Sequence, residues 1–134
     1  MILGALADLY IATQDSSYLD HADVIAKATM SQMVDSSGIL SDTCDLNHTC
    51  SGDNLQFKGV FARNLQKLYK SRADPAYKAF LNKNAEAIWA KGIAVENNAC
   101  LAGPDWDGPY VFGSATASSQ SSALQCLVAA FAIS

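Results

Sequence analysis

Apolar side chains recur at three- and four-residue spacing along five stretches of the chain, a pattern that predicts helices. The expected helices cover, approximately, residues 1–13, 18–34, 54–70, 75–91 and 115–133. Asp74 suits an N-cap and Pro75 suits the first helical position. In the helix that follows, we expect Ile88 and Trp89 to face inward. No segment has a convincing strand pattern, so we expect an all-α fold in a single domain, residues 1–134.

The apolar pattern also repeats over a longer interval. The phrase Ala-Leu-Ala-Asp-Leu-Tyr at residues 5–10 returns 59 residues later as Asn-Leu-Gln-Lys-Leu-Tyr at 64–69. It returns once more as Ala-Leu-Gln-Cys-Leu-Val at 123–128. Self-similarity at a fixed interval is typical of repeat architectures. The repeating unit is a helix, a short turn, a second helix and a long loop, and the third unit stops after its first helix.

The loop lengths predict where a ligand would bind. Short turns join the first helix to the second and the third to the fourth, so these pairs form antiparallel hairpins. Both long loops then lie at one end, together with the N-termini of the third and fifth helices, whose unpaired N–H groups attract polar ligands. The fifth helix has no charged side chain, which predicts burial on every side.

Composition narrows the class of protein. Half of the residues are apolar and 16% are charged, which is typical of a chain that folds around a core. The net charge of −4 and the lack of a basic stripe argue against nucleic-acid binding. No apolar run is long enough to span a membrane, and the first helix lacks the basic start of a signal peptide. We expect no cofactor.

The four cysteines predict an oxidising environment. Cys44 and Cys50 flank Asn47-His48-Thr49, an N-glycosylation acceptor, which indicates a secreted or cell-wall-associated glycoprotein. We favour a Cys44–Cys50 disulfide, which would leave Cys100 to pair with Cys126. Four cysteines allow three pairings, and the sequence alone does not choose among them.

A zinc site is the alternative for the same segment. Cys44, His48 and Cys50 could supply three ligands, but a fourth ligand and a standard spacing are missing. We therefore expect no metal.

Several stretches resemble glycoside hydrolase family 76, and the resemblance extends in order along nearly the whole chain. The strongest match is Phe-Lys-Gly-Val-Phe-Ala-Arg-Asn-Leu at residues 57–65. The others are residues 2–10 with Tyr18-Leu19-Asp20, Gly38-Ile39-Leu40 before the first cysteine pair, Asn84-Ala85 with Ile88-Trp89, Trp106 with Gly108-Pro109, and Gln120-Ser121-Ser122-Ala123.

The resemblance implies a fold and an activity. Family members are (α/α)6 toroids, and this chain matches the C-terminal part, so we expect helical hairpins making half of a six-hairpin barrel. Members are endo-α-1,6-mannanases or fungal cell-wall enzymes that process or transfer mannan-linked anchors. Their catalytic pair is two adjacent aspartates in the N-terminal half. This chain contains no Asp-Asp dipeptide, so no catalytic residue can be assigned in it.

The resemblance and the predicted loop end together nominate residues that bind a mannose-containing glycan. They are Asp53, Phe57, Lys58, Trp106, Asp107 and Gln120. Each has a structural alternative: Asp53 could cap a helix, Phe57 could join the core and Trp106 could anchor its loop. Asp105 and Asp107 could form an acid/base pair, although two turn-forming aspartates are the commoner arrangement.

Two functions and one assembly state remain as hypotheses. The chain belongs to an enzyme of the mannanase type, or to a non-catalytic carbohydrate-binding or interaction protein that kept the sugar-facing loops. The inner faces of the first and fifth helices would be exposed in half of a toroid. Exposed apolar faces usually mark interfaces, so we expect a homodimer.

Overall fold

The five expected helices are present in the computed structural model, which describes residues 2–47 and 49–134. The long helices are α1 (Ile2–Thr13), α2 (Ser17–Gln32), α4 (Phe57–Ser71), α5 (Pro75–Ala87) and α6 (Ala117–Phe131). Shorter elements are α3 (Thr43–Leu46), a 3-10 turn (Gly52–Gln56), a π-helical turn (Ile88–Gly92), β1 (Ile93–Glu96) and β2 (Ala99–Ala102).

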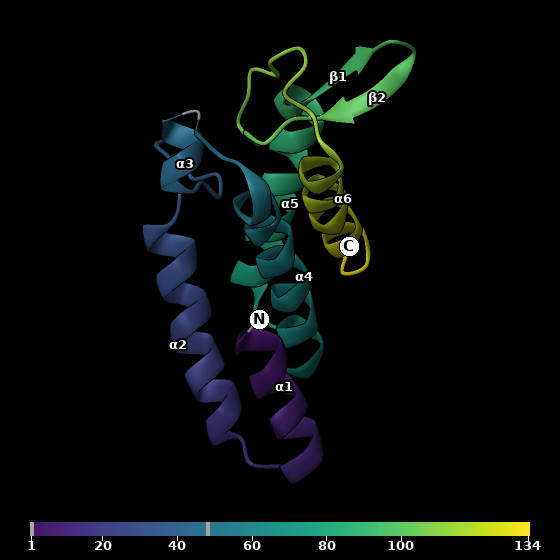
Figure 1. Ribbon diagram of the computed structural model, residues 1–134. Helices are drawn as coiled ribbons and strands as arrows, with labels where there is room; N and C mark the ends of the chain where they lie inside the picture. Colours follow the sequence, from purple (N-terminus) through teal and green to yellow (C-terminus); the bar gives the residue numbers. More distant parts are fainter. Residues whose placement is uncertain (1, 48) are drawn as a thin grey trace.

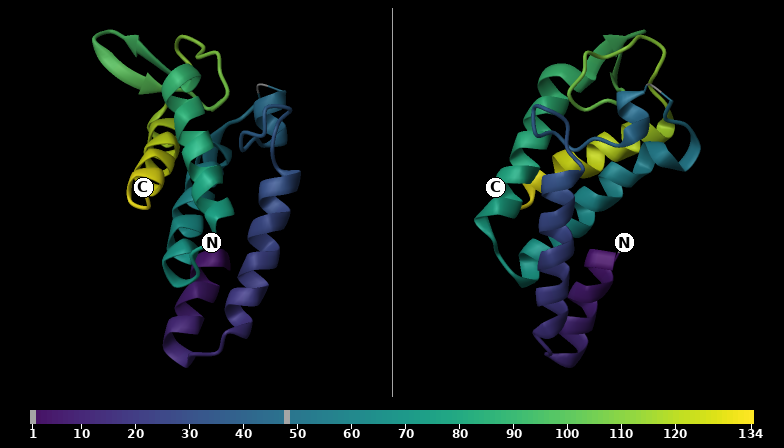
Figure 2. Two further views of the ribbon diagram at one scale, coloured as in Figure 1. Left: turned by 180° about the vertical axis from the view of Figure 1, so that it is seen from behind. Right: turned by 90° about the vertical axis from the view of Figure 1, so that its left-hand side faces the viewer.

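The long helices form two rows. In the first row α4 packs between α1 and α6, and in the second α2 and α5 cover the outer side (Figures 1 and 2). The short turns make α1–α2 and α4–α5 antiparallel hairpins, as the loop lengths predicted. Asp74 caps α5 by accepting a hydrogen bond of 2.8 Å from the Ala76 N–H, and Pro75 takes the first helical position.

The three copies of the repeated phrase occupy α1, α4 and α6, but they are covered to different extents. Leu65 and Leu68 of α4 are fully buried. Leu124, the α6 counterpart of Leu65, is 55% exposed, and Leu9, the α1 counterpart of Leu68, is 43% exposed. Within the row α1–α4–α6, the middle helix has a neighbour on each side, whereas each outer helix has a neighbour on one side (Figure 2).

The core lies between the two rows and beneath the last long loop. Asn84 is one of the polar side chains in the core with no exposed surface. Its Oδ1 accepts a hydrogen bond of 2.8 Å from the Leu40 N–H, and its Nδ2 donates to the Phe80 carbonyl. The amide therefore joins the α2–α3 connection to α5. Within residues 2–47 and 49–134, no helix is long and apolar enough to cross a membrane.

The β-hairpin corrects the expectation that the chain has no strands. β1 and β2 pair antiparallel, with Ile93 opposite Ala102 and Glu96 opposite Ala99. Asn97 and Asn98 form the turn with positive φ angles of 52° and 61°, a conformation that Asn tolerates better than most residues. Four-residue strands are too short to give a clear alternating pattern, so the sequence analysis missed them.

Two aromatic side chains are exposed, although the core was the expected position of one and the alternative position of the other. Trp89, expected to face inward, is 73% exposed, whereas its neighbour Ile88 is fully buried. The two side chains point in different directions around the π-helical turn, and only Ile88 faces the core. Phe57, whose structural alternative was a core position, is 54% exposed at the start of α4.

The expected Cys100–Cys126 disulfide is also wrong. Cys126 lies on the buried side of α6, where burial raises the pKa of its thiol to about 12. Cys100 is exposed on β2, and both thiols are free. The hairpin carries Cys100 outward into solvent, whereas Cys126 faces the core.

Candidate functional site

The two long loops lie at the same end of the molecule (Figure 1). A cleft of about 580 Å³ opens between them. One wall is the segment around α3, with Cys44, Asp45, Cys50 and Leu55. The other wall is the loop after β2, including Pro104, Asp105, Pro109, Tyr110 and Val111. The cleft thus lies at the end of the fold that the loop lengths predicted for a ligand.

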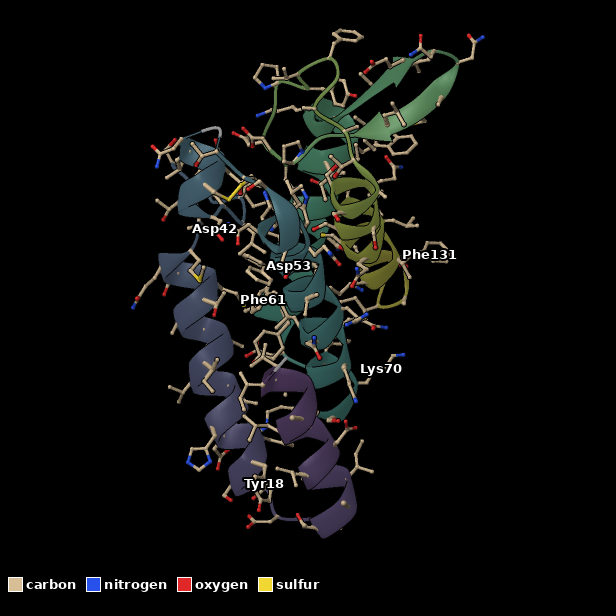
Figure 3. The ribbon with its side chains drawn as sticks, viewed as in Figure 1. Tyr18, Asp42, Asp53, Phe61, Lys70 and Phe131 are labelled. Atoms are coloured by element: carbon tan, nitrogen blue, oxygen red, sulfur yellow. A yellow bond between two sulfur atoms is a disulfide. The ribbon has the colours of Figure 1, made fainter. Side chains whose placement is uncertain are left out.

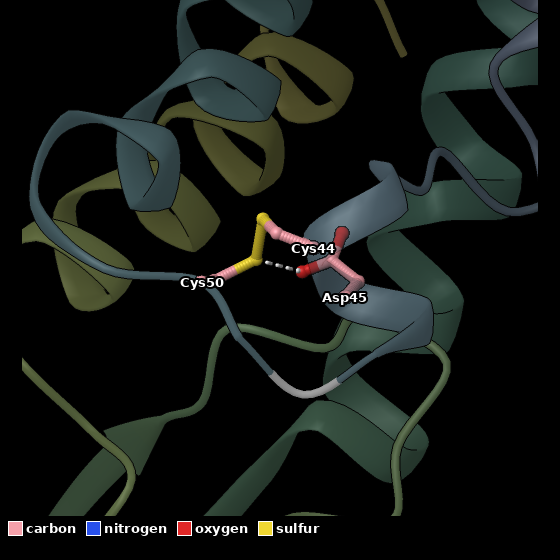
Figure 4. A group of neighbouring side chains, drawn as sticks. All are labelled: Cys44, Asp45 and Cys50. Carbon is pink, nitrogen blue, oxygen red and sulfur yellow. Dashed lines mark hydrogen bonds between the residues drawn. A yellow bond between two sulfur atoms is a disulfide. The ribbon is translucent and has the colours of Figure 1, made fainter.

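A disulfide bond closes the loop that forms the first wall of the cleft. Cys44 and Cys50 are bonded, as the sequence analysis favoured, and Asn47 between them is exposed. Figure 4 shows Asp45 beside the bond, with its Oδ1 3.2 Å from the Cys50 Sγ. A disulfide sulfur carries no proton, so this is a packing contact. Because the two cysteines are oxidised, neither offers a thiolate to zinc, and His48, the third ligand of that alternative, lies outside the described residues.

Lys58 links the two walls beneath the cleft. Its ammonium donates to Asp45 Oδ2 at 2.5 Å and to the Pro104 carbonyl at 2.7 Å. It also lies 5.1 Å from the centre of the Trp106 ring, within the range of a cation–π contact. Lys58 is 6% exposed, Asp45 5% and Trp106 1%, so the whole group is shielded from water.

Aspartates shape the second wall. The Asp107 N–H donates to Asp105 Oδ1 at 3.0 Å, which is the turn-forming arrangement weighed against an acid/base pair. Asp107 then accepts hydrogen bonds from Lys91 at 2.7 Å and from the Ser37 hydroxyl at 2.9 Å. The Lys91 hydrogen bond, more than any other contact, lowers the pKa of the Asp107 carboxyl. Asp107 therefore ties its loop to the π-helical turn after α5 and to the α2–α3 connection.

Asp105 differs from Asp107 because it faces the cleft. Burial is the main reason that its pKa lies above the usual value, and the nearby Asp45 and Asp107 carboxylates act in the same direction. A carboxylate accepts hydrogen bonds, so Asp105 can accept one from a ligand hydroxyl.

The β-hairpin supports the rim of the cleft. Glu96 accepts hydrogen bonds from the Tyr110 hydroxyl at 2.8 Å and from the Gly113 N–H at 3.1 Å. Tyr110 also meets Phe112 edge to face, with ring centres 5.7 Å apart. Tyr110 lines the cleft, so the hairpin fixes the position of an aromatic ring at a polar opening.

None of the six residues nominated from the sequence lines this cleft. Lys58, Trp106 and Asp107 lie behind its walls, and Trp106 is too deeply buried to offer a ring face to solvent. Gln120 joins α6 to β2: its Oε1 accepts from the Ala102 N–H at 2.7 Å and its Nε2 donates to the Cys100 carbonyl. Asp53, labelled in Figure 3, and Phe57 are both exposed at or beside the start of α4.

Two residues that line the cleft, Asp45 and Tyr110, were not predicted as site residues from the sequence. Asp45 sits inside the cysteine loop, where a hydrogen bond from the Asp42 N–H to its side chain marks a helix start. That Asp-x-x-Asp spacing is readable in the sequence as a capping box. Tyr110 follows the Gly108-Pro109 turn, and an aromatic residue in a loop of turn formers is the signal that pointed to Trp106 instead.

Solved structures of other proteins are similar to this chain over nearly its whole length. The chain is similar to the Lin0763 protein of Listeria innocua, with 23% identity and a TM-score of 0.82 over 98% of this chain and 35% of that one. It is similar to the GH76A alpha-1,6-mannanase of Salegentibacter sp. HEL1_6, with 24% identity and a TM-score of 0.82 over 98% of this chain and 38% of that one.

An inactive variant of the same Salegentibacter enzyme, with two aspartates replaced by alanine, has been solved with alpha-1,6-mannotetrose. This chain is 25% identical to it, with a TM-score of 0.83 over 98% of this chain and 38% of that one. The chain therefore has the fold of one part of an (α/α)6 toroid and spans little more than a third of the length of these structures.

Sequence comparison gives the family directly. A search of curated protein sequences found no match to this chain. The profile of glycosyl hydrolase family 76, in contrast, matches residues 1–133, nearly the whole sequence. The chain belongs to glycosyl hydrolase family 76.

Proposed function

We propose that this chain forms the glycan-binding end of a protein that acts on α-1,6-linked mannan or mannan-containing cell-wall glycans. The observation that carries the proposal is the cleft of about 580 Å³ between two loop walls in a family 76 fold. Pockets of about 300–1,000 Å³ suit small ligands, so the cleft is large enough for a short stretch of sugar units. Mannooligosaccharide complexes of the Salegentibacter relative support the ligand class.

The chemistry of the walls suits a sugar. Pyranose rings present apolar C–H faces, which pack on aromatic rings, and hydroxyl groups, which pair with carboxyl groups. Tyr110 offers the ring at the rim, while Asp105 offers a half-buried carboxyl whose pKa burial raises. Lys58, Trp106, Asp107 and Gln120 lie behind the walls and support them. Asp53 and Phe57, which are exposed, form a second candidate contact at the start of α4.

Cleavage requires groups beyond those proposed for binding. Glycosidases of the retaining type use one carboxylate as nucleophile and another as acid/base, about 5–5.5 Å apart. This sequence has no two adjacent aspartates, so we assign no catalytic residue to it. That observation favours a second candidate function, carbohydrate binding without cleavage.

The test uses the protein that carries this chain. It is incubated with α-1,6-mannan, and released mannooligosaccharides are measured by chromatography. Binding of α-1,6-mannotetraose is measured by calorimetry, with maltotetraose as the control sugar. Release supports the enzyme. Binding without release supports the second candidate. Absence of both rejects the proposal.

Three matched variants locate the binding site. Asp105→Asn is expected to weaken mannotetraose binding by about tenfold. The substitution replaces a carboxylate oxygen, which accepts a hydrogen bond from the ligand in a desolvated site, by an NH2 group, which cannot accept one. Asp53→Asn tests the exposed contact at the start of α4. Glu86→Gln is the control, since Glu86 is exposed on α5 and does not line the cleft. Weakening by Asp53→Asn alone would move the site from the cleft to the α4 start.

We also propose a secreted or cell-wall location, supported by the Cys44–Cys50 disulfide and the exposed acceptor Asn47. Digestion of the native-source protein with an N-glycosidase, followed by mass spectrometry of the peptide containing residue 47, tests both glycosylation and secretory passage. An unmodified peptide in every preparation would contradict the glycoprotein proposal.

Self-association through α6 completes the proposal. Leu124, Val128 and Phe131 are more than half exposed on a helix with no charged side chain, and the equivalent of Leu124 in α4 is fully buried. A second copy of the chain would shield this face. Light scattering should give twice the monomer mass, and Leu124→Ser should reduce it to the monomer. A monomeric mass at micromolar concentration rejects the dimer.

A further inference from the structure

One buried ammonium group connects the two walls of the cleft. Asp45 belongs to the α3 wall and Pro104 to the loop wall, and both line the cleft. Lys58, which bonds to both, rises from the first turn of α4 and does not itself line the cleft. A lysine ammonium has three N–H donors, so it can hold two acceptors at once.

Both walls need such support. α3 is four residues long, and a helix of that length has no independent stability. The loop wall, from Gly103 to Ala115, contains no helix or strand. Each wall is therefore held by contacts to other segments, and the bonds of Lys58 cross from one wall to the other.

Burial makes these bonds strong constraints. A charged group that loses water must be compensated by partners at close range, and removing one partner leaves a costly unpaired charge. Lys58 and Asp45 are each almost fully buried, and the Trp106 ring lies against the ammonium on a further side. The two walls cannot separate without exposing or unpairing that charge.

We propose that Lys58 is a positioning residue: it sets the spacing of the two cleft walls through Asp45 and the Pro104 carbonyl, and so sets glycan affinity without touching the sugar. This inference rests on the proposed function for its ligand, an α-1,6-linked mannooligosaccharide. The spacing of the walls, in contrast, is inferred from the contacts of Lys58 alone. The two parts can therefore be tested separately.

The main variant is Lys58→Met combined with Asp45→Asn. Methionine fills the space of the lysine stem, and asparagine keeps an oxygen for the Asp42 N–H, so the ion pair is removed without a leftover charge. Lys58→Gln combined with Asp45→Asn is the milder variant for the case in which this double variant does not fold, because the glutamine amide can still donate a hydrogen bond and no charge is left unpaired. The matched control is Lys67→Met with Asp8→Asn, which removes an exposed ion pair of similar length, 2.6 Å, between α4 and α1.

The first readout needs no ligand. Hydrogen exchange measured by mass spectrometry compares peptides covering residues 43–47 and 49–56 on one wall and 103–116 on the other. In the Lys58 variant, amides of both walls should exchange about tenfold faster, while those of α1 should not change. The control variant should leave both walls unchanged. Unchanged exchange in both walls of the Lys58 variant overturns the inference.

The second readout is the affinity for α-1,6-mannotetraose. A positioning role predicts a Kd raised about tenfold in the folded Lys58→Met double variant and less in the Lys58→Gln double variant, since loosening a binding site weakens the contacts it makes. A purely structural role would lower the melting temperature and leave the Kd of the folded protein unchanged, which also overturns the inference. If the unaltered protein binds no mannotetraose, the proposed function fails, and the exchange comparison still decides whether Lys58 spaces the walls.

Discussion

Gly59 of α4 lies directly against Ser122 of α6. A methyl group built on Gly59 would come within 2.5 Å of the Ser122 Cα and 2.6 Å of its carbonyl oxygen. The Gly59 N–H donates to the Ser122 hydroxyl at 2.9 Å, which satisfies one of the free donors of the first turn of α4. Glycine is therefore required here by the close approach of two helices.

Replacing Gly59 by alanine should destabilise the protein by about 2 kcal/mol. The added carbon meets backbone, so the helices must separate, and overpacking of this kind costs about 1–3 kcal/mol. The higher helix propensity of alanine, worth about 1 kcal/mol, offsets only part of that cost. Urea unfolding followed by circular dichroism measures the difference. The control is Gly4→Ala in α1, whose methyl would meet the Asn64 side chain, which can move aside, so a smaller loss is expected.

Removal of the cleft disulfide should lower stability and loosen one wall. The bond closes a loop with a sequence separation of 6, and the chain-entropy relation gives about 2 kcal/mol for so short a loop. We expect Cys44→Ser with Cys50→Ser to lose this amount in urea unfolding. Cys100→Ser is the matched control because Cys100 is exposed and free, and its stability should be unchanged. Equal effects of both changes would contradict the assignment.

Asn84→Ala should be among the most damaging single substitutions. It leaves the Leu40 N–H without its acceptor in the protein interior, and a buried unsatisfied donor costs about 1–3 kcal/mol. Asn54→Ala, at an exposed position, is the control. Thermal unfolding measures both. A loss no greater than that of the control would mean that the amide does not support the α2–α3 connection.

Acid should weaken the contact between α2 and α5. The Tyr77 hydroxyl donates to Asp23 Oδ1 at 2.5 Å, and this bond is the main reason that the pKa of Asp23 lies below its usual value. A lowered folded-state pKa gives stability that is present above the ordinary pKa of 3.8 and is lost as the pH falls through the folded value. Asp23→Asn should therefore lower the melting temperature at pH 6 and matter progressively less below about pH 4. A constant difference across this range would contradict the role of Asp23.

Much of the fold could be predicted because it depends on local pattern. The positions of Leu65 and Leu68 in the apolar stripe predicted α4, and Asp74-Pro75 predicted the start of α5. Loop lengths predicted that both long loops meet at one end. Trp89 was placed wrongly because periodicity gives a stripe about 100° wide, and the residue at its margin is decided by tertiary packing.

The candidate site was harder to predict because its contacts join residues distant in sequence. Lys58 meets Asp45 and Pro104 across separations of 13 and 46 residues, and no local pattern encodes those pairings. Resemblance to the family drew attention to Lys58 and Trp106, but it could not distinguish residues behind the walls from those lining them. Cys100 was paired with Cys126 by elimination. The β-hairpin that holds Cys100 in solvent, away from Cys126, could not be predicted from the sequence.

The unequal covering of the repeated helices has a consequence for how the chain opens. Each helix of the first row, α1–α4–α6, contacts its immediate neighbours, so its local stability is a sum of its own tendency to be helical and the interfaces it shares. α4 shares two such interfaces, while α1 and α6 share one each with that row. Opening should thus begin at the outer helices and move inward, and α4 should be the last ordered segment when the protein unfolds.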